Sequence, residues 1–248
     1  DEYRGVALTT GSAGTIGCGD YLKQKYPTSK IIASEALQCP TLLQNGFGAH
    51  RIEGIGDKHV PWIHNIKNTD MVVAIDDDAV VNIMRLFNER DGKKYLIQQG
   101  VPEEIVNKLD LLGFSGIANV LSAIKFAKYY ELGENDVVLT VLTDSMELYG
   151  SRIGEMRISH GPFLETNAAA VFARYLQGEG TDNLLELTYA SRKRIHNLKY
   201  YTWVEQQGRS FEEIQQQWYA PEYWTDIQGQ AGEIDEQIKA FNDLVGLE

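Results

Sequence analysis

The sequence has few cysteines, few basic residues and no long apolar run. Its two cysteines, Cys18 and Cys39, are far apart and form no Cys-x-x-Cys pair, so neither a disulfide scaffold nor a structural zinc site is expected. No apolar stretch approaches the roughly 18 residues of a membrane-spanning helix. The N-terminal residues also lack the basic, apolar and small-residue blocks of a signal peptide. We therefore expect a cytoplasmic protein.

Acidic residues outnumber basic ones, 35 to 23, which gives a formal net charge of −12. Proteins that bind nucleic acids or anionic membranes collect phosphates with clustered Lys and Arg, and this sequence has no such cluster. Neither partner is expected. The 248 residues, 43% of them hydrophobic, are enough for one large domain, or for a medium domain with an appendage.

Up to about residue 150 the sequence alternates between strand and helix patterns. Short apolar, β-prone runs that predict strands occupy residues 5–9, 30–35, 71–75 and 137–142. The last of them is typical of a buried parallel strand. Helical patterns follow at 17–25, 79–89 and from Ser115 onwards. This alternation predicts a three-layer α/β fold, with a mostly parallel sheet and flanking helices.

The C-terminal part has a different texture. Residues 165–248 show no convincing strand and are rich in Gln, Tyr and Trp, and Ser210 to Glu213 form a capping box that predicts a helix start. We therefore expect two parts, an α/β domain at 1–150 and an α-helical C-terminal extension at 151–248.

Three consecutive carboxylates, Asp76, Asp77 and Asp78, precede the helix at 79–89. Such a run suggests a metal site, but negative side chains at a helix N-terminus also complement the helix dipole. Because no further ligands stand nearby in the sequence, the helix-terminus interpretation is the stronger one, and no metal site is assigned.

A glycine-rich turn at residues 10–17 (TGSAGTIG) stands between the first strand and the first helix. Such a turn presents backbone N–H groups and a helix N-terminus to one point, and so can hold a phosphate group. The string also fits the dinucleotide-binding turn of extended short-chain dehydrogenases, with Glu35 as the ribose-binding carboxylate. That enzyme class needs a downstream Tyr-x-x-x-Lys pair, and the one match, Tyr21 with Lys25, lies inside the first helix. A turn without any ligand is a third possibility.

Four segments then resemble a known enzyme family, in the family's order. Residues 11–15 (GSAGT) match its phosphate loop, and residues 50–56 (HRIEGIG) match its His-x-Ile-x-Gly-Ile-Gly stretch. Residues 113–118 (GFSGIA) align with Gly-Ile-Ser-Ser-Gly-Ala, and residues 143–149 (TDSMELY) align with Pro-Asp/Ser-Ser-x-x-x-Tyr. Up to about residue 150, the sequence thus resembles the cysteine synthase and cystathionine β-synthase group of pyridoxal-phosphate enzymes. Their fold, known as fold type II, is that of the tryptophan synthase β-subunit.

The resemblance implies a bound pyridoxal 5'-phosphate and a role for each matching residue. It assigns the cofactor phosphate to Gly11, Ser12, Ala13, Gly14 and Thr15. The loop beside the cofactor ring and the substrate would comprise Gly54, Ile55 and Gly56. Ser115 would meet the pyridine nitrogen, and Asp144 would have a secondary polar role near the ring.

A serine hydroxyl at the pyridine nitrogen suits a neutral ring, in which β-elimination and β-replacement are favoured. Ser115 could instead be a plain helix N-cap, and Asp144 could cap the segment that follows it. The sequence also departs from the family pattern: Ala13 replaces a glycine, Gly116 replaces a second serine, and Asp57 stands where an alanine is usual. Asp57 bears on the identity of the substrate.

In this family a lysine in a Ser-x-Lys-Asp/Asn context holds the cofactor as a Schiff base, and no lysine here has that context. We therefore expect the chain to be the C-terminal half of a longer enzyme, or one piece of a cleaved or split one, inactive alone, with the lysine in a missing N-terminal half. The implied reaction is β-elimination or β-replacement on a small amino acid, such as cysteine, serine or O-acetylserine, through an aminoacrylate. A homodimer is also implied.

Two other functions stay open. One is an NAD(P)-dependent oxidoreductase of the extended short-chain dehydrogenase type. The other is a non-catalytic module of the same pyridoxal-phosphate fold that docks a partner through its aromatic C-terminal part.

Overall fold

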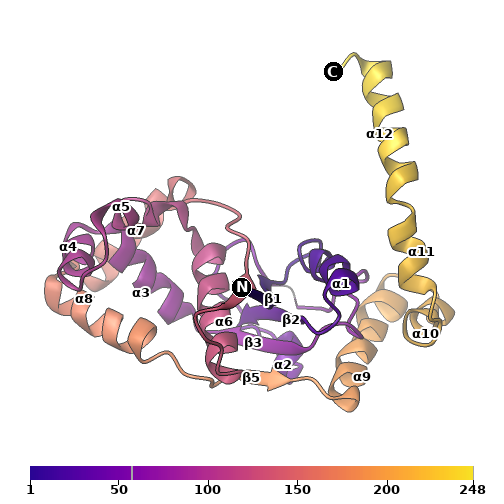
Figure 1. The fold of residues 1–248 in the computed structure, drawn as a ribbon, viewed down its shortest axis with the longest axis horizontal. Helices are drawn as coiled ribbons and strands as arrows, with labels where there is room; N and C mark the ends of the chain where they lie inside the picture. Colours follow the sequence, from indigo (N-terminus) through magenta and orange to yellow (C-terminus); the bar gives the residue numbers. More distant parts are fainter. Residues whose placement is uncertain (57, 248) are drawn as a thin grey trace. The chain divides into compact units, whose positions relative to one another are not determined.

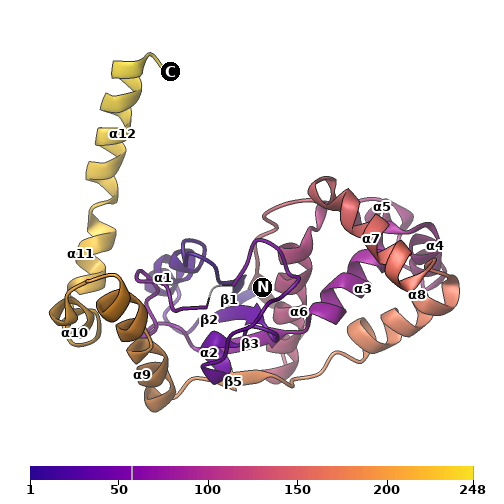
Figure 2. The same ribbon diagram turned by 180° about the vertical axis from the view of Figure 1, so that it is seen from behind.

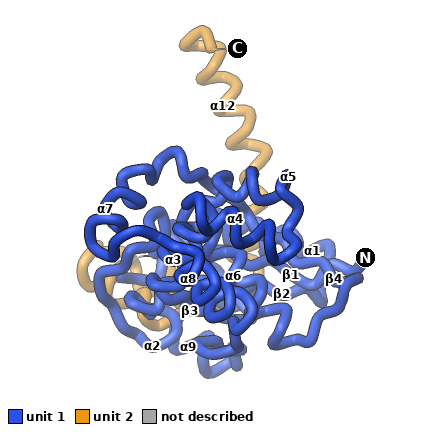
Figure 3. The backbone as a smooth tube through the Cα atoms, turned by 90° about the vertical axis from the view of Figure 1, so that its left-hand side faces the viewer, with its two compact units in different colours: residues 1–195 blue, residues 196–248 orange. Residues whose placement is uncertain are grey.

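The computed structural model describes residues 1–56 and 58–247, which form two compact units, residues 1–195 and 196–248 (Figure 3). Asp57, noted above for its bearing on the substrate, lies outside the described residues. The first unit continues well past residue 150. Each unit is considered by itself.

The first unit is built on a five-stranded sheet in the order β4-β1-β2-β3-β5. Its strands are β1 (Glu2–Thr9), β2 (Lys30–Ala36), β3 (Met71–Ile75), β4 (Asp136–Leu139) and β5 (Leu184–Glu186). The first four run parallel and β5 is antiparallel to β3. The predicted α/β fold with a mostly parallel sheet is confirmed. The expectation that no strand follows residue 165 is wrong, because β5 is present.

Helices cover both faces of the sheet. Figure 1 shows α6 (Phe114–Tyr129) and α1 (Ile16–Lys25) on opposite sides of the strands. Ile32 belongs to the apolar cluster that includes α6, whereas its neighbour Ile31 faces Gly19 of α1. Successive residues of a strand point to opposite faces, so β2 is covered on both. A Cβ on Gly19 would lie 2.9 Å from the Ile31 side chain, so a larger residue would force these elements apart.

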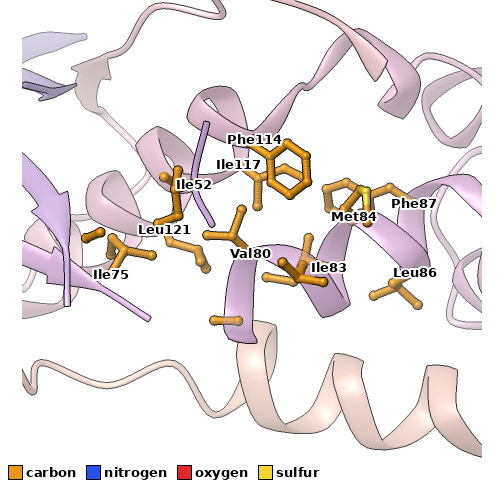
Figure 4. Close-up of a cluster of buried hydrophobic side chains, with 14 of the residues drawn as sticks. Ile52, Ile75, Val80, Ile83, Met84, Leu86, Phe87, Phe114, Ile117 and Leu121 are labelled. Carbon is orange, nitrogen blue, oxygen red and sulfur yellow. The ribbon is translucent and has the colours of Figure 1, made fainter. Parts of the chain in front are cut away.

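The apolar core continues into a group of helices beside the sheet (Figure 2). Helix α3 (Asp77–Asn88) begins at the N-cap Asp76, whose side chain accepts a hydrogen bond from the Asp78 amide at 3.1 Å. The helix-terminus interpretation of this triplet is therefore confirmed. The apolar face of α3 is buried in the core, as Figure 4 shows for Val80, Ile83, Met84 and Phe87.

The remaining elements of the first unit are short. They are α2 (Thr41–Gln44), α4 (Arg90–Gln98), α5 (Glu103–Val106), α7 (Gly150–His160), α8 (Glu165–Val171) and α9 (Tyr189–Asn197), the last of which contains the boundary between the units. There are also 3-10 turns at Leu109–Leu111 and Met146–Tyr149 and a π-helical segment at Phe172–Gln177. Among the described residues no single helix is long and apolar enough to cross a membrane. Two neighbouring segments, Glu103–Leu111 and Phe114–Tyr129, reach that length and hydropathy only when they are taken together, and the chain bends by 119° between them.

Strand β4 corrects a prediction. The apolar run at 137–142 was expected to be a buried strand, but β4 has four residues and lies at an edge of the sheet. Leu139, Val141 and Leu142 are 44%, 39% and 50% exposed. An apolar run predicts a strand, but it does not show whether another strand will cover it.

The second unit is helical, as expected. Its elements are a π-helical segment (Tyr200–Gln206), α10 (Phe211–Tyr219), α11 (Tyr223–Gly229) and α12 (Ala231–Val245). Ser210 caps α10 as predicted, because its hydroxyl accepts a hydrogen bond from the Glu213 amide at 3.2 Å. Trp218 is buried beside His196, with ring centroids 5.0 Å apart.

Candidate cofactor-binding site

The glycine-rich turn lies between the end of β1 and the start of α1 at Ile16. No backbone N–H of residues 11–15 donates a hydrogen bond within the described part of the chain. The first turn of α1 carries no acidic side chain to occupy these amides. Ala13, where the family has a glycine, adopts a left-handed φ of 68°. Free amides at a helix N-terminus favour an anion, so the turn can hold a phosphate group.

The turn is held in place by its neighbours in the sheet and in the 50–56 segment. The Thr10 amide donates to the Ser34 carbonyl at 2.8 Å, and the Gly56 amide donates to the Thr10 carbonyl at 2.8 Å. Gly56 has a φ of 76°, and a Cβ there would lie 2.8 Å from Nε2 of His50. Glycine is therefore required where this segment passes the turn.

Ser115 reaches the same region from the start of α6. Its helix begins at Phe114 with Gly113 as the N-cap, so the alternative that Ser115 is itself the N-cap is wrong. The buried Ser115 hydroxyl lies 2.6 Å from Oγ1 of Thr143 and 3.2 Å from Oδ1 of Asp144. The other oxygen of Asp144 accepts a hydrogen bond from the Tyr149 hydroxyl.

These segments enclose a cavity of about 290 Å³. It is lined by Leu8, Thr9, Gly11, Ser12, Thr15, Gly54, Ser115, Asn119, Val141, Thr143 and Asp144. Six of the ten residues predicted to bind the cofactor are in this set. The other four, Ala13, Gly14, Ile55 and Gly56, are not, and Ile55 is instead packed in the apolar core.

A molecule with a phosphate at one end and a ring nitrogen at the other fits this lining. The unbonded amides of the lining residues Gly11, Ser12 and Thr15 supply donors for the phosphate, and the Ser115 hydroxyl supplies one hydrogen-bonding group for the ring. The volume is close to the lower end of small-molecule sites, about 300 Å³.

Five lining residues were not predicted, and the polar Asn119 and Thr143 are among them. Asn119 is 1% exposed; its side chain accepts a hydrogen bond from the Thr9 amide at 2.6 Å and donates one to the Val141 carbonyl at 2.7 Å. It therefore ties the end of β1 to the segment that leads to Asp144. The signal was present in the sequence, because Ser115, Asn119 and Ser122 place polar side chains on one face of an apolar helix.

Glu35, the ribose-binding candidate of the dinucleotide interpretation, is engaged elsewhere. Its carboxylate accepts hydrogen bonds from the Leu42 and Leu43 amides, both at 2.8 Å, and burial raises its pKa to about 7. Tyr21 and Lys25 lie together on α1, with the ammonium 5.2 Å from the ring centroid. Neither they nor Glu35 line the cavity among the described residues, so the geometry disfavours a dinucleotide site.

Comparisons with known proteins agree with the resemblance found in the sequence. No protein-family model matches the chain. Over 140 residues it is 31% identical to cysteine synthase B of Campylobacter jejuni and 29% identical to cysteine synthase of Staphylococcus aureus, matches that cover 56% of this chain. The matches cover only 40% and 39% of those relatives, so the chain spans well under half their length.

A solved structure shows that the fold is shared. The crystal structure of a cysteine synthase from Entamoeba histolytica superposes with a TM-score of 0.52 at 22% sequence identity, over 70% of this chain and 45% of that one. The resemblance to the cysteine synthase group and the fold type II architecture are thus confirmed for a partial segment.

Proposed function

We propose that this chain, which shares a fold and a homologous segment with cysteine synthases, supplies the phosphate- and ring-binding half of a pyridoxal-phosphate enzyme. The enzyme would catalyse β-elimination or β-replacement on a small amino acid of the cysteine, serine or O-acetylserine type. The observation that carries the proposal is the cavity lined both by Gly11, Ser12 and Thr15, whose amides donate to no described group, and by Ser115.

The residues of the chain would bind and orient. Bound pyridoxal phosphate withdraws electrons from the substrate α-carbon, which permits loss of the α-proton and of a β-substituent. The amides of residues 11–15, with the hydroxyls of Ser12 and Thr15, would hold the phosphate. Gly54 would allow close approach beside the ring, and Ser115 would hydrogen-bond the ring nitrogen.

The lysine that such an enzyme needs would come from a missing N-terminal half. Among the described residues no lysine lines the cavity, and the matched relatives are more than twice as long as the aligned segment. Residues 1–150 would then belong to the catalytic domain and residues 151–248 to an extension. A homodimer, as the resemblance implies, and a cytoplasmic location complete the proposal; Cys18 and Cys39 form no disulfide with each other, which suits a reducing compartment.

The test is a titration of the chain with pyridoxal 5'-phosphate, in which binding is monitored by the phosphorus NMR resonance of the cofactor. Ser12→Asp should weaken binding at least about tenfold, because it places a negative charge beside the phosphate. Ser151→Asp makes the same change at an exposed position of α7 and should bind as the wild type does. Failure of the wild type to bind, or equal binding by Ser12→Asp, would refute the proposal. Binding of NADH in place of pyridoxal phosphate would support the oxidoreductase.

A further inference from the structure

The last two helices of the second unit carry a stripe of exposed apolar side chains. It begins on α11, continues along α12, and consists of Ile227, Ala231, Ile234, Ile238, Phe241 and Val245. The exposure of the five larger side chains runs from 41% for Ile227 to 59% for Phe241, and no residue of α12 is buried. Scattered apolar side chains on a surface are ordinary, whereas a continuous row of them marks a contact surface.

The spacing of this stripe is that of a coiled coil. Its members follow one another in steps of four and three residues, so that the pattern repeats every seven. Gln230, between the two helices, is itself in a right-handed helical conformation, with φ −75° and ψ −9°. A seven-residue repeat keeps one seam of a helix against a second helix along its length. The stripe therefore fits a helical partner.

Helix α12 also needs a partner for its own stability. It has 15 residues, with Gly232 in its first turn, and isolated helices of about this length are marginal in water. Most helices in proteins are stabilised because one apolar face is buried against another element. In α12 that face is exposed, so burial against another chain would supply the stabilisation.

We infer that this stripe pairs with the same stripe of a second copy of the chain, in an antiparallel coiled coil. The stripe is complementary to itself when one copy is reversed about residue 236. Every member then faces an apolar residue of the second copy: Ile234 faces Ile238, Ile227 faces Val245, and the small Ala231 faces the large Phe241. Such a contact uses one patch twice, as closed two-fold dimers do.

The residues beside the stripe suit a second copy better than an oppositely charged partner. Only one of the six flanking residues is charged; they are Gln228, Gln230, Asp235, Gln237, Asn242 and Leu244. The other acidic residues of α12, Glu233, Glu236 and Asp243, occupy outer positions of the repeat. A chain of net charge −12 can thus pair with itself here without aligning rows of carboxylates, and a basic partner would meet no acidic row along the seam.

The area of the stripe is sufficient for a dimer. About half of each of its five large side chains is exposed, so pairing of two copies would bury on the order of 1,000 Å² in total. Specific interfaces begin at about that size. The dimer should therefore form and dissociate with protein concentration.

The experiment is sedimentation equilibrium of the full chain from about 1 to 300 μM, a range in which the wild type should pass from monomer to dimer. Ile234→Asp should weaken dimerisation at least about a hundredfold, because each copy would bury an unpaired charge in the seam. Ile238→Asp should do the same and keeps the test valid if the first variant does not fold. Ile158→Asp makes the same change on α7, at a side chain that is 89% exposed, and should dimerise as the wild type does.

Two further readouts concern α12 itself. Its backbone amides should exchange with solvent more slowly at high protein concentration, and both seam variants should lose this dependence. Asp235→Asn should tighten the dimer about two- to fivefold, because the two copies of Asp235 lie on the same side of an antiparallel pair and repel.

A wild type that stays monomeric throughout, or a dimer that both seam variants leave intact, would overturn the inference. Unchanged dimerisation in Asp235→Asn would overturn the antiparallel arrangement. If the monomeric wild type instead binds phosphatidylcholine vesicles and Ile234→Asp does not, lipid covers the stripe and the inference is wrong. Because α12 lies in the second unit and none of these measurements uses pyridoxal phosphate, the inference and the proposed cofactor site fail separately.

Discussion

Replacing Asn119 by alanine should destabilise the first unit and increase the mobility of the β1 end that lines the cavity. The change removes the acceptor of the buried Thr9 amide and the donor to the Val141 carbonyl. A buried amide left without a partner costs about 1–3 kcal/mol, whereas the carbonyl of the partly exposed Val141 can turn to water at a cost below about 1 kcal/mol. Alanine regains about 0.5 kcal/mol in helix propensity. The net loss should be about 2 kcal/mol.

Two measurements check this value. Urea unfolding should show the loss directly, and hydrogen exchange at the Thr9 amide should accelerate about thirtyfold, since 1.4 kcal/mol corresponds to a factor of ten. Asn82→Ala is the matched control, because Asn82 lies on α3 and, within the described part of the chain, its side chain bonds only its own helix, through the Asp78 carbonyl. That variant should stay within about 0.5 kcal/mol of wild type. If Asn119→Ala is equally harmless and Thr9 stays protected, the bridging role is wrong.

Three further perturbations follow from the packing and charge of the first unit. Gly5→Ala would place a Cβ 2.4 Å from a backbone oxygen of β2, so thermal unfolding should show that the free energy of unfolding falls by about 3 kcal/mol. Gly17→Ala is the control, because its Cβ would meet open space, and it should be neutral or slightly stabilising. Gly113→Ala should lower the free energy of unfolding by about 1–3 kcal/mol, because the new Cβ would displace the Asp144 carboxylate. Most of this destabilisation should vanish when Asp144 is also replaced by alanine; an unchanged destabilisation would contradict the close approach of Gly113 and Asp144. Burial raises the pKa of Glu35 to about 7 from its ordinary 4.5, so the folded chain binds that proton more tightly than the unfolded chain does. The free energy of unfolding should therefore fall as pH rises from about 4.5 through 7, by at most about 1.4 kcal/mol per unit, and Glu35→Gln should flatten this fall; parallel curves would refute it.

The sequence predicted those parts of the fold whose signals are local. Strands β1, β2 and β3 are apolar runs bounded by turns, and the buried face of α3 follows a helical period. Strand β5 was missed because three residues are too few to show a period of two. Strand β4 was predicted at 137–142, but it ends at Leu139 and was wrongly taken as buried, because its exposure depends on pairing with a distant strand.

Only those residues of the candidate site that lie in recognisable sequence motifs could be predicted. The segments that carry Gly11, Gly54, Ser115 and Asp144 resemble family motifs, and the structure brings all four residues to one cavity. Asn119 was not found, since its two partners lie on separate segments that meet only in the fold. The polar face that it shares with Ser115 and Ser122 is visible in the sequence, but only the fold shows which groups it joins.

The edge position of β4 has a practical consequence for work with this chain. An outer strand offers unbonded N–H and C=O groups, and here aliphatic side chains at 139, 141 and 142 stand beside them in solvent. Such an exposed sheet edge can pair with strands of other protein molecules and so promotes aggregation. A concentrated preparation should therefore gain solubility from a lysine at Leu142, and a binding measurement made without it should be repeated at several protein concentrations.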